Sequence, residues 1–208
     1  MTTMIWSPLR LNSLTSTIVL DSSVVINILA CGDAARFLKE LDRKVVLPRQ
    51  VVNEIRREPV QHPDSTNSFP NLLQSGLLQL YELEDENYLK FLDLVGAAAP
   101  DSLGDGEAAT IAVAEHLQCA AIIDERKATR IARGRRDVSL TACTIDLYTH
   151  SLAAAKYSRE EVASLIFSSM QHARMRIPQE RRPWVLDLIG AERAMQCSCF
   201  PKSFAVAT

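Results

Sequence analysis

Long apolar runs are missing from this chain of 208 residues. No stretch approaches the roughly 20 consecutive apolar residues that a membrane-spanning helix needs, so we expect no membrane partner. The first 16 residues break up their apolar positions with Pro8 and Asn12, and they form no continuous apolar core of a secretory signal. We therefore expect a cytoplasmic protein in which residues 1–16 form a tail, held against the domain by Trp6 and Leu9.

Glycine-rich phosphate loops are also missing. Neither G-x-x-x-x-G-K-[ST] nor G-x-G-x-x-G occurs, which disfavours a P-loop or dinucleotide-binding fold. Aromatic residues make up only 6% of the chain, so no platform for base stacking is evident. The formal net charge is only -2, and any binding of nucleic acid must therefore rest on a local basic patch.

Cysteine is too sparse for a disulfide framework. The five residues are an odd number, and Cys31, Cys119 and Cys143 each stand alone in an apolar stretch. This pattern favours reduced thiols in a cytoplasmic protein. Cys197 and Cys199 form a C-x-C without a second Cys or His pair beside it, so we do not expect a metal site there.

Short apolar runs alternate with stretches of helical spacing along most of the chain. We expect strands at residues 17–20, 45–47, 77–83, 120–123 and 137–140. We expect helices at residues 22–30, 34–41, 49–57, 84–95, 107–117, 125–133, 143–155, 160–175 and 183–195, with loops at 59–70 and 100–106. The alternation predicts an α/β three-layer sandwich with a central, mostly parallel sheet of about four or five strands. The domain would span residues 17–176, and residues 177–208 would be a C-terminal extension with one helix.

Two of the predicted strands end in an aspartate that opens a helix. Asp21 follows residues 17–20, and Asp124 follows residues 120–123. In a parallel sheet both carboxylates lie at the carboxyl edge, where ligands bind. Each aspartate taken alone could also be an ordinary helix N-cap, and that alternative stays open.

Further acids are predicted at the same edge. Glu54 lies on the helix after the second strand, and Asp105 and Glu107 stand at the head of an Ala-rich helix. Taken singly, Glu54 could be a solvated acid or a partner of Arg57 or Arg49. Asp105 could be an N-cap, and Glu107 suits the dipole of a first helical turn.

Several carboxylates at one sheet edge repel one another and raise one another's pKa. A hard divalent cation such as Mg²⁺ or Mn²⁺ prefers oxygen ligands and removes that cost. Such a site can polarise a phosphodiester and activate water for in-line attack.

A basic strip follows Asp124 directly. Arg126, Arg130 and Arg133 share a helical face, which places positive charge beside the acidic edge. The alternative is a solvated helix face whose cations pair with nearby acids. The full strip consists of Arg126, Lys127, Arg130, Arg133, Arg135 and Arg136.

Four segments in order resemble the PIN-domain family, over residues 18 to about 175. They are I-V-L-D-S-S-V-V-I-N at 18–27, P-R-Q-V-V-N-E-I at 48–55, G-E-A-A-T-I-A-V-A at 106–114, and I-I-D-E-R-K-A-T-R-I-A at 122–132. The third and fourth segments are most similar to the VapC-like branch of ribonuclease toxins and its bacterial and archaeal relatives.

The resemblance implies catalytic acids that hold Mg²⁺ or Mn²⁺. Direct metal ligands would be Asp21, Glu107 and Asp124, and Glu54 would complete the shell or orient water. Asp105 would be an outer ligand or the cap. Phosphate or substrate contacts would be made by Ser22, Arg126, Lys127 and Arg130. Ser22 and Ser23 would also orient the carboxylate of Asp21. A role for Asp146 and for residues 141–144 stays open.

The resemblance further implies hydrolysis of RNA, a small antitoxin protein as partner, and a homodimer. Two alternatives belong to other classes. One is a PIN fold that acts as a binding or regulatory module without cleavage. The other is a receiver-like phosphate-transfer protein, which is disfavoured because Ser22 and Ser23, rather than a second acid, follow Asp21.

Overall fold

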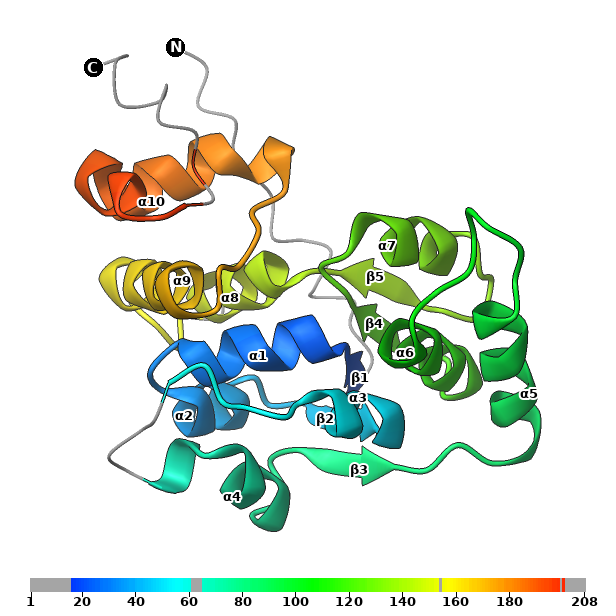
Figure 1. The fold of residues 1–208 in the computed structure, drawn as a ribbon. Helices are drawn as coiled ribbons and strands as arrows, with labels where there is room; N and C mark the ends of the chain where they lie inside the picture. Colours follow the sequence, from blue (N-terminus) through cyan, green and yellow to red (C-terminus); the bar gives the residue numbers. More distant parts are fainter. Residues whose placement is uncertain (1–15, 61–64, 154, 199, 201–208) are drawn as a thin grey trace.

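The chain forms a sheet of five parallel strands covered by helices on both faces (Figure 1). The computed structural model describes residues 16–60, 65–153, 155–198 and 200. The expected roles of Trp6, Leu9 and Cys199 lie outside these residues. The strands are β1 (Thr17–Leu20), β2 (Lys44–Pro48), β3 (Gln79–Tyr81), β4 (Ala120–Ile122) and β5 (Leu140–Ala142), in the order β3-β2-β1-β4-β5.

The side chains of the strands alternate between two buried cores. Ile18 and Leu20 of β1 join one hydrophobic cluster, and Val19 between them joins the other. The alternation repeats in β2 and β4, as the two-residue period of a strand requires. Apolar residues on both faces are typical of a parallel sheet covered by two helical layers, and the α/β sandwich predicted from the sequence is confirmed.

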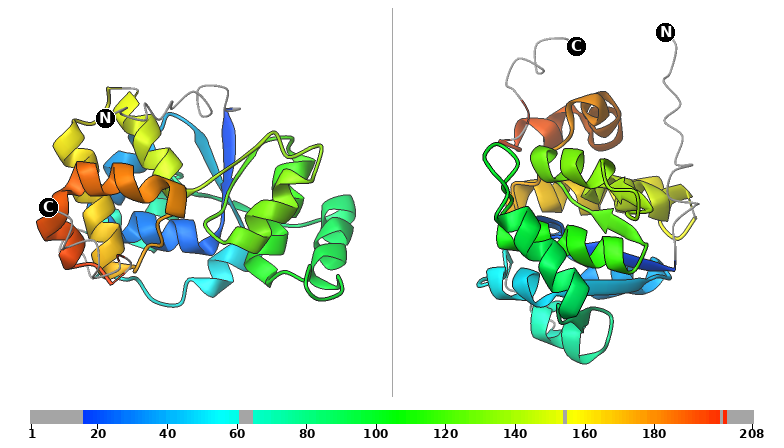
Figure 2. Two further views of the ribbon diagram at one scale, coloured as in Figure 1. Left: turned by 90° about the horizontal axis from the view of Figure 1, so that it is seen from above. Right: turned by 90° about the vertical axis from the view of Figure 1, so that its right-hand side faces the viewer.

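The two helical layers differ in size. The smaller one holds α5 (Asp85–Val95), α6 (Asp105–His116) and α7 (Arg126–Arg133) (Figures 1 and 2). The larger cluster takes side chains from α1 (Ser22–Ala30), α2 (Ala34–Glu40), α3 (Arg49–Glu54), α4 (Phe69–Gln74), α8 (Thr144–Ala153), α9 (Arg159–His172) and α10 (Arg182–Met195). Two short 3₁₀ helices, η2 (Ser65–Asn67) and η3 (Gln179–Arg181), precede α4 and α10.

Most elements lie where the sequence predicts them, and the clearest differences are at α4, β5 and α3. Helix α4 was not predicted, and its start overlaps the expected loop at 59–70, because Pro70 fits the first turn of a helix as well as a loop. Strand β5 begins at Leu140 rather than at residue 137, and α3 ends at Glu54 rather than at residue 57.

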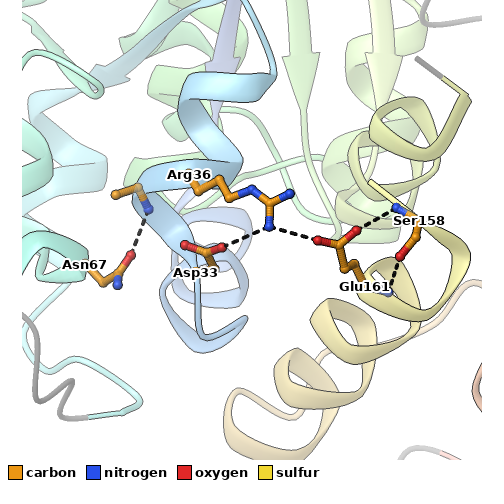
Figure 3. Close-up of polar contacts among 6 residues, drawn as sticks. Asp33, Arg36, Asn67, Ser158 and Glu161 are labelled. Atoms are coloured by element: carbon orange, nitrogen blue, oxygen red, sulfur yellow. Dashed lines mark hydrogen bonds and ion pairs between the residues drawn. The ribbon is translucent and has the colours of Figure 1, made fainter. Parts of the chain in front are cut away.

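The beginning of α9 is fixed by a polar cluster that joins it to α2 (Figure 3). Ser158 and Glu161 form a capping box: the Ser158 amide donates to Glu161 Oε2 at 2.8 Å, and the Glu161 amide donates to Ser158 Oγ at 3.2 Å. Arg36 pairs with the same Glu161 at 2.9 Å and stacks over the ring of Tyr157 at 4.4 Å. These contacts fix one end of α9 close to α2.

The predicted C-terminal extension packs into the same core. Helix α10 lies on α9, and its side chains Val185, Leu188 and Ile189 belong to the larger hydrophobic cluster (Figure 1). Within the described ranges, no helix is long and apolar enough to cross a membrane.

Candidate functional site

The sheet has a topological switch point between β1 and β4. From β1 the chain continues to β2 and β3 on one side, and it later crosses to β4 and β5 on the other. Leu20 aligns with Ile122, and the Asp21 amide donates to the Ile122 carbonyl at 3.0 Å. Asp21 and Asp124 therefore emerge from adjacent strand ends, in the crevice where ligands of open α/β sheets bind.

Asp21 is buried, with only 3% of its surface exposed. Its Oδ2 accepts from Ser23 Oγ at 2.6 Å and from the Ser23 amide at 3.4 Å, so Asp21 is the N-cap of α1. Its Oδ1 is also buried but has no hydrogen-bond partner. Burial raises the pKa of this carboxyl, and the charge of Glu54 raises it further. The N-cap alternative thus accounts for one oxygen of Asp21 and leaves the other unexplained.

Asp124 is held by side chains far away in the sequence. Its Oδ1 accepts from the Thr144 amide at 2.8 Å, and its Oδ2 accepts from Thr144 Oγ1 at 2.6 Å and Asn27 Nδ2 at 2.7 Å. The N-cap alternative is wrong for Asp124, because Glu125 caps α7 through the Ala128 amide. Burial raises the pKa of Asp124 to about 6, although the hydrogen bonds from Thr144 oppose the shift.

Glu107 approaches Asp21 from the head of α6. Its Oε2 accepts from the Gly104 amide at 3.2 Å, which fixes the side chain in the first turn of the helix. Burial raises the pKa of Glu107, and the negative charges of Asp21 and Glu125 add to the shift. Asp105 is exposed, and Gly104 rather than Asp105 occupies the cap position. The predicted cap role of Asp105 is therefore wrong.

Glu54 reaches the same place from the end of α3. Its Oε1 accepts from the Gly106 amide at 2.8 Å, in the first turn of α6. A Cβ atom at position 106 would lie only 2.4 Å from Glu54 Oε2, so the contact depends on glycine. Glu54 is solvent-exposed, but it is not simply a solvated acid, and Arg49 pairs with Glu82 instead.

These acids form one electrostatic group around Asp21, which we call the acid set: Asp21, Glu54, Glu107 and Asp124. Each of the other three raises the pKa of Asp21 or has its own pKa raised by Asp21. Glu125 contributes to the same field and was missed from the sequence, although it directly follows the strand-end Asp124.

The acid set fits a divalent cation chemically. Its donors are carboxylate oxygens, which Mg²⁺ and Mn²⁺ prefer, and Asp21 Oδ1 offers a buried oxygen with no other partner. Among the described residues, no three His, Cys, Asp or Glu side chains are placed close enough to hold an ion between them. Ligation would therefore require rotation of the Glu107 or Glu54 side chain toward Asp21.

Residues 17–191 match a family model described as a PIN domain. The chain belongs to the PIN-domain family. PIN domains are generally nucleases and generally use divalent metals. No curated protein and no solved structure matches the chain significantly.

The basic strip of this PIN domain divides into two kinds of residue. Arg130 pairs with Asp101, and Arg135 pairs with Glu115, as the solvated-face alternative predicts. Lys127 Nζ donates to the Ser102 carbonyl at 2.6 Å, and its charge lowers the pKa of Glu107. The remaining cations are exposed and have no ion pair in the part of the chain that the structure describes; they are Arg126, Arg133 and Arg136.

Asp146 of the PIN domain is not part of the acid set. Its Oδ2 accepts from the Cys143 amide at 3.0 Å, and its Oδ1 lies 3.2 Å from Arg181 Nη2. Both oxygens are thus engaged in holding the first turn of α8 and the segment before α10.

Proposed function

We propose that this PIN domain is a divalent-metal-dependent endoribonuclease. The observation that carries the proposal is Asp21 Oδ1, a buried carboxylate oxygen without a donor at the centre of a group of acids. A buried polar atom left unsatisfied costs about 1–3 kcal/mol, and mutual repulsion among the acids adds to that cost. A divalent cation would satisfy the buried oxygen and would also offset the repulsion among the acids.

We assign the metal ligands to Asp21, Glu107 and Asp124. When bound, Mg²⁺ or Mn²⁺ supplies Lewis acidity for a phosphodiester and lowers the pKa of bound water. The chain itself contributes orientation: Ser23 holds one oxygen of Asp21, and Thr144 with Asn27 holds both oxygens of Asp124. Fixed second partners of this kind commonly set the geometry of metal ligands.

Glu54 has a different place in the proposal. The Gly106 amide fixes one of its oxygens, and the residue as a whole is exposed. We assign it the role of orienting the attacking water or of completing the metal shell. Asp105 is exposed, and we leave it out of the ligands.

The substrate in this proposal is single-stranded or looped RNA. Arg126, Lys127 and Arg130 would bind phosphates beside the acid set, and Ser22 at the first position of α1 would contact the substrate. The similarity to VapC-like proteins extends the proposal to a toxin silenced by a small antitoxin and acting as a homodimer. Growth arrest upon expression, relieved by the neighbouring gene, would test that extension.

Asparagine variants of the two strand-end aspartates test the catalytic assignment. We expect Asp21→Asn and Asp124→Asn to lower Mn²⁺-dependent cleavage of a generic RNA by roughly 10²-fold or more, because each removes a ligand charge. The circular dichroism spectrum should stay unchanged, since asparagine keeps the shape of the side chain. Its amide oxygen can still accept from Ser23 at position 21, and at position 124 it can replace one of the two accepting oxygens.

A second pair of variants discriminates between the two acids at the head of α6. Glu107→Gln should lose activity like the aspartate variants, whereas Asp105→Asn should stay within about twofold of the parent, as surface changes away from the site usually do. Equal activity of the parent and Asp21→Asn would reject the nuclease. A protein that does not bind Mn²⁺ at millimolar concentration would instead be a binding module with a PIN fold.

A further inference from the structure

A second group of cations lies in the segment that joins α9 to α10. Residues 173–181 include Arg174 and Arg176, and η3 ends with Arg181. The family resemblance assigned no role to this part of the chain. Its position relative to the acid set follows from contacts of the helices on either side.

Helix α9 crosses α1 (Figures 1 and 2). Glu161, near its start, pairs with Arg36, which lies beyond the far end of α1. Two turns later, Ser169 Oγ donates to the carbonyl of Asn27, in the second half of α1, at 2.9 Å. Helix α9 ends at His172, and the chain that follows runs from there to the start of α10 (Figures 1 and 2).

The other end of the segment lies beside Asp124. Arg181 Nη2 is 3.2 Å from Asp146 Oδ1, in the first turn of α8. Thr144, the first residue of that helix, donates to Asp124 at 2.8 Å. The starts of α1, α8 and α10 lie at the same end of their helical layer (Figures 1 and 2). The end of the segment at Arg181 therefore lies beside the start of α8, on the Asp124 side of the acid set and away from α6.

The backbone of the segment turns two arginines outward. Met175 and Ile177 are buried in the larger cluster, with 2% and 4% exposure, whereas Arg174 and Arg176 between them are exposed. Within the described residues neither arginine has an ion pair. The cations of α9 and α10 farther from the acid set do pair: Arg159 with Asp187, and Arg193 with Glu160.

We propose that Arg174 and Arg176 form a second phosphate-binding border, opposite the basic strip of α7. This inference rests on the proposed ribonuclease function and specifies how its substrate lies. A single strand would cross the acid set between the two borders, with phosphates contacted on both sides. Cations on both sides would offset the repulsion between the phosphates and the carboxylates, which a single border could do only in part.

The test measures binding of a single-stranded RNA of about 12 nucleotides, a length within the usual site sizes of single-strand binders. An Asp124→Asn background prevents cleavage, and gel analysis verifies that the RNA stays intact. We expect Arg174→Ala with Arg176→Ala to weaken binding about tenfold at low salt. The slope of log K against log salt concentration should fall by roughly 1.4, since each phosphate contact on a single strand contributes about 0.7.

Lys39→Ala with Lys44→Ala is the matched control. Both lysines are exposed, and they lie at the opposite edge of the sheet, where β2 begins. The two substitutions remove the same charge as the arginine pair, and they should leave the salt dependence of RNA binding unchanged. Arg174→Lys with Arg176→Lys should restore most of the affinity, because a phosphate contact needs the charge. The proposal would be overturned if the arginine-to-alanine pair left the salt slope unchanged. It would also be overturned if the control pair lost as much RNA affinity, or if the arginine-to-lysine pair did not restore affinity.

The two proposals fail separately. If Asp21→Asn still cleaves RNA while the arginine variants lose RNA binding as expected, the nuclease site is rejected and the second phosphate-binding border is kept. Loss of cleavage in Asp21→Asn, together with full binding by the arginine variants, would do the reverse.

Discussion

Gly106 determines how closely Glu54 can approach the head of α6. The Glu54 carboxylate accepts from the Gly106 amide at 2.8 Å, and an added Cβ would lie 2.4 Å from its other oxygen. We therefore expect Gly106→Ala to displace Glu54 and to lower RNA cleavage about tenfold or more. Stability should change little, because alanine is favoured over glycine inside a helix by up to about 1 kcal/mol, which offsets the lost contact.

Gly104→Ala is the matched control for this prediction. It stands two residues earlier in the same turn, and its added Cβ would meet Glu107 Oε2 at 3.7 Å, an ordinary contact distance. Cleavage rates and thermal unfolding of both variants provide the comparison. If Gly106→Ala and Gly104→Ala cleaved RNA equally well, the position of Glu54 would not matter for cleavage.

At the residue scale, the sequence predicts where the two aspartates lie on the sheet but not what holds them. The strand-end positions of Asp21 and Asp124 follow from local pattern and the parallel-sheet rule. The donors to Asp124 do not, because Asn27 and Thr144 are separated by 117 residues and meet only in the folded chain. Likewise, no local pattern shows that one oxygen of Asp21 has no donor.

At the scale of elements, the sequence predicts a basic strip on α7, and the cations of that strip have different surroundings in the fold. Arg130 is paired with Asp101, whereas Arg126 has no ion pair among the described residues. We expect Arg126→Ala to weaken RNA binding by roughly threefold or more and to reduce the salt slope by about 0.7. Arg130→Ala should have a smaller effect, because Asp101 already offsets part of its charge.

Removal of the pairing acid provides the reciprocal measurement. Asp101→Asn should strengthen RNA binding, since it leaves the Arg130 charge without its partner, and surface pairs of this kind contribute little to stability. If Arg126→Ala and Arg130→Ala lost equal RNA affinity and Asp101→Asn gained none, the ion pair between Arg130 and Asp101 would have no effect on RNA binding.

Helix and strand predictions succeeded where one periodicity dominates and failed where two signals compete. Strand β1 and helix α1 have the predicted limits because apolar spacing and the aspartate cap agree. Helix α4 was missed because prolines and polar residues around it favoured a loop. Strand β5 is displaced from the predicted 137–140 because Val138 is buried outside the ladder, so apolar character alone did not locate the pairing.

At the scale of the whole molecule, the fold gathers negative charge from α1, α3, α6 and the end of β4 at one edge. The order of strands and helices predicts acids at this edge, but the position of residues 177–198 could not be predicted. That segment has no strand and no strong motif, and its place is set by burial of Val185 and Leu188 against α9.

This concentration of charge makes the stability of the metal-free protein depend on pH. The pKa of Asp124 is about 6 in the folded protein and near 3.8 when unfolded, so the folded state binds the proton more tightly. Stability from this group is complete below pH 4 and is lost as pH rises through 6. We expect the free energy of unfolding to fall by about 2 kcal/mol over that interval, and raised pKa values of Asp21 and Glu107 act in the same direction.

Divalent metal should reverse the loss, because it binds the ionised acid set and not the unfolded chain. At pH 7, Mn²⁺ at 100 times its dissociation constant should raise the free energy of unfolding by about 2.7 kcal/mol, measured by urea denaturation with and without EDTA. Asp124→Asn should be less sensitive to pH between 4 and 6 and should gain less from Mn²⁺, because the neutral amide neither repels Asp21 nor attracts the ion. A parent protein with flat stability across this pH range, or a variant stabilised by Mn²⁺ as much as the parent, would mean that the acids at this edge do not act as one charged site.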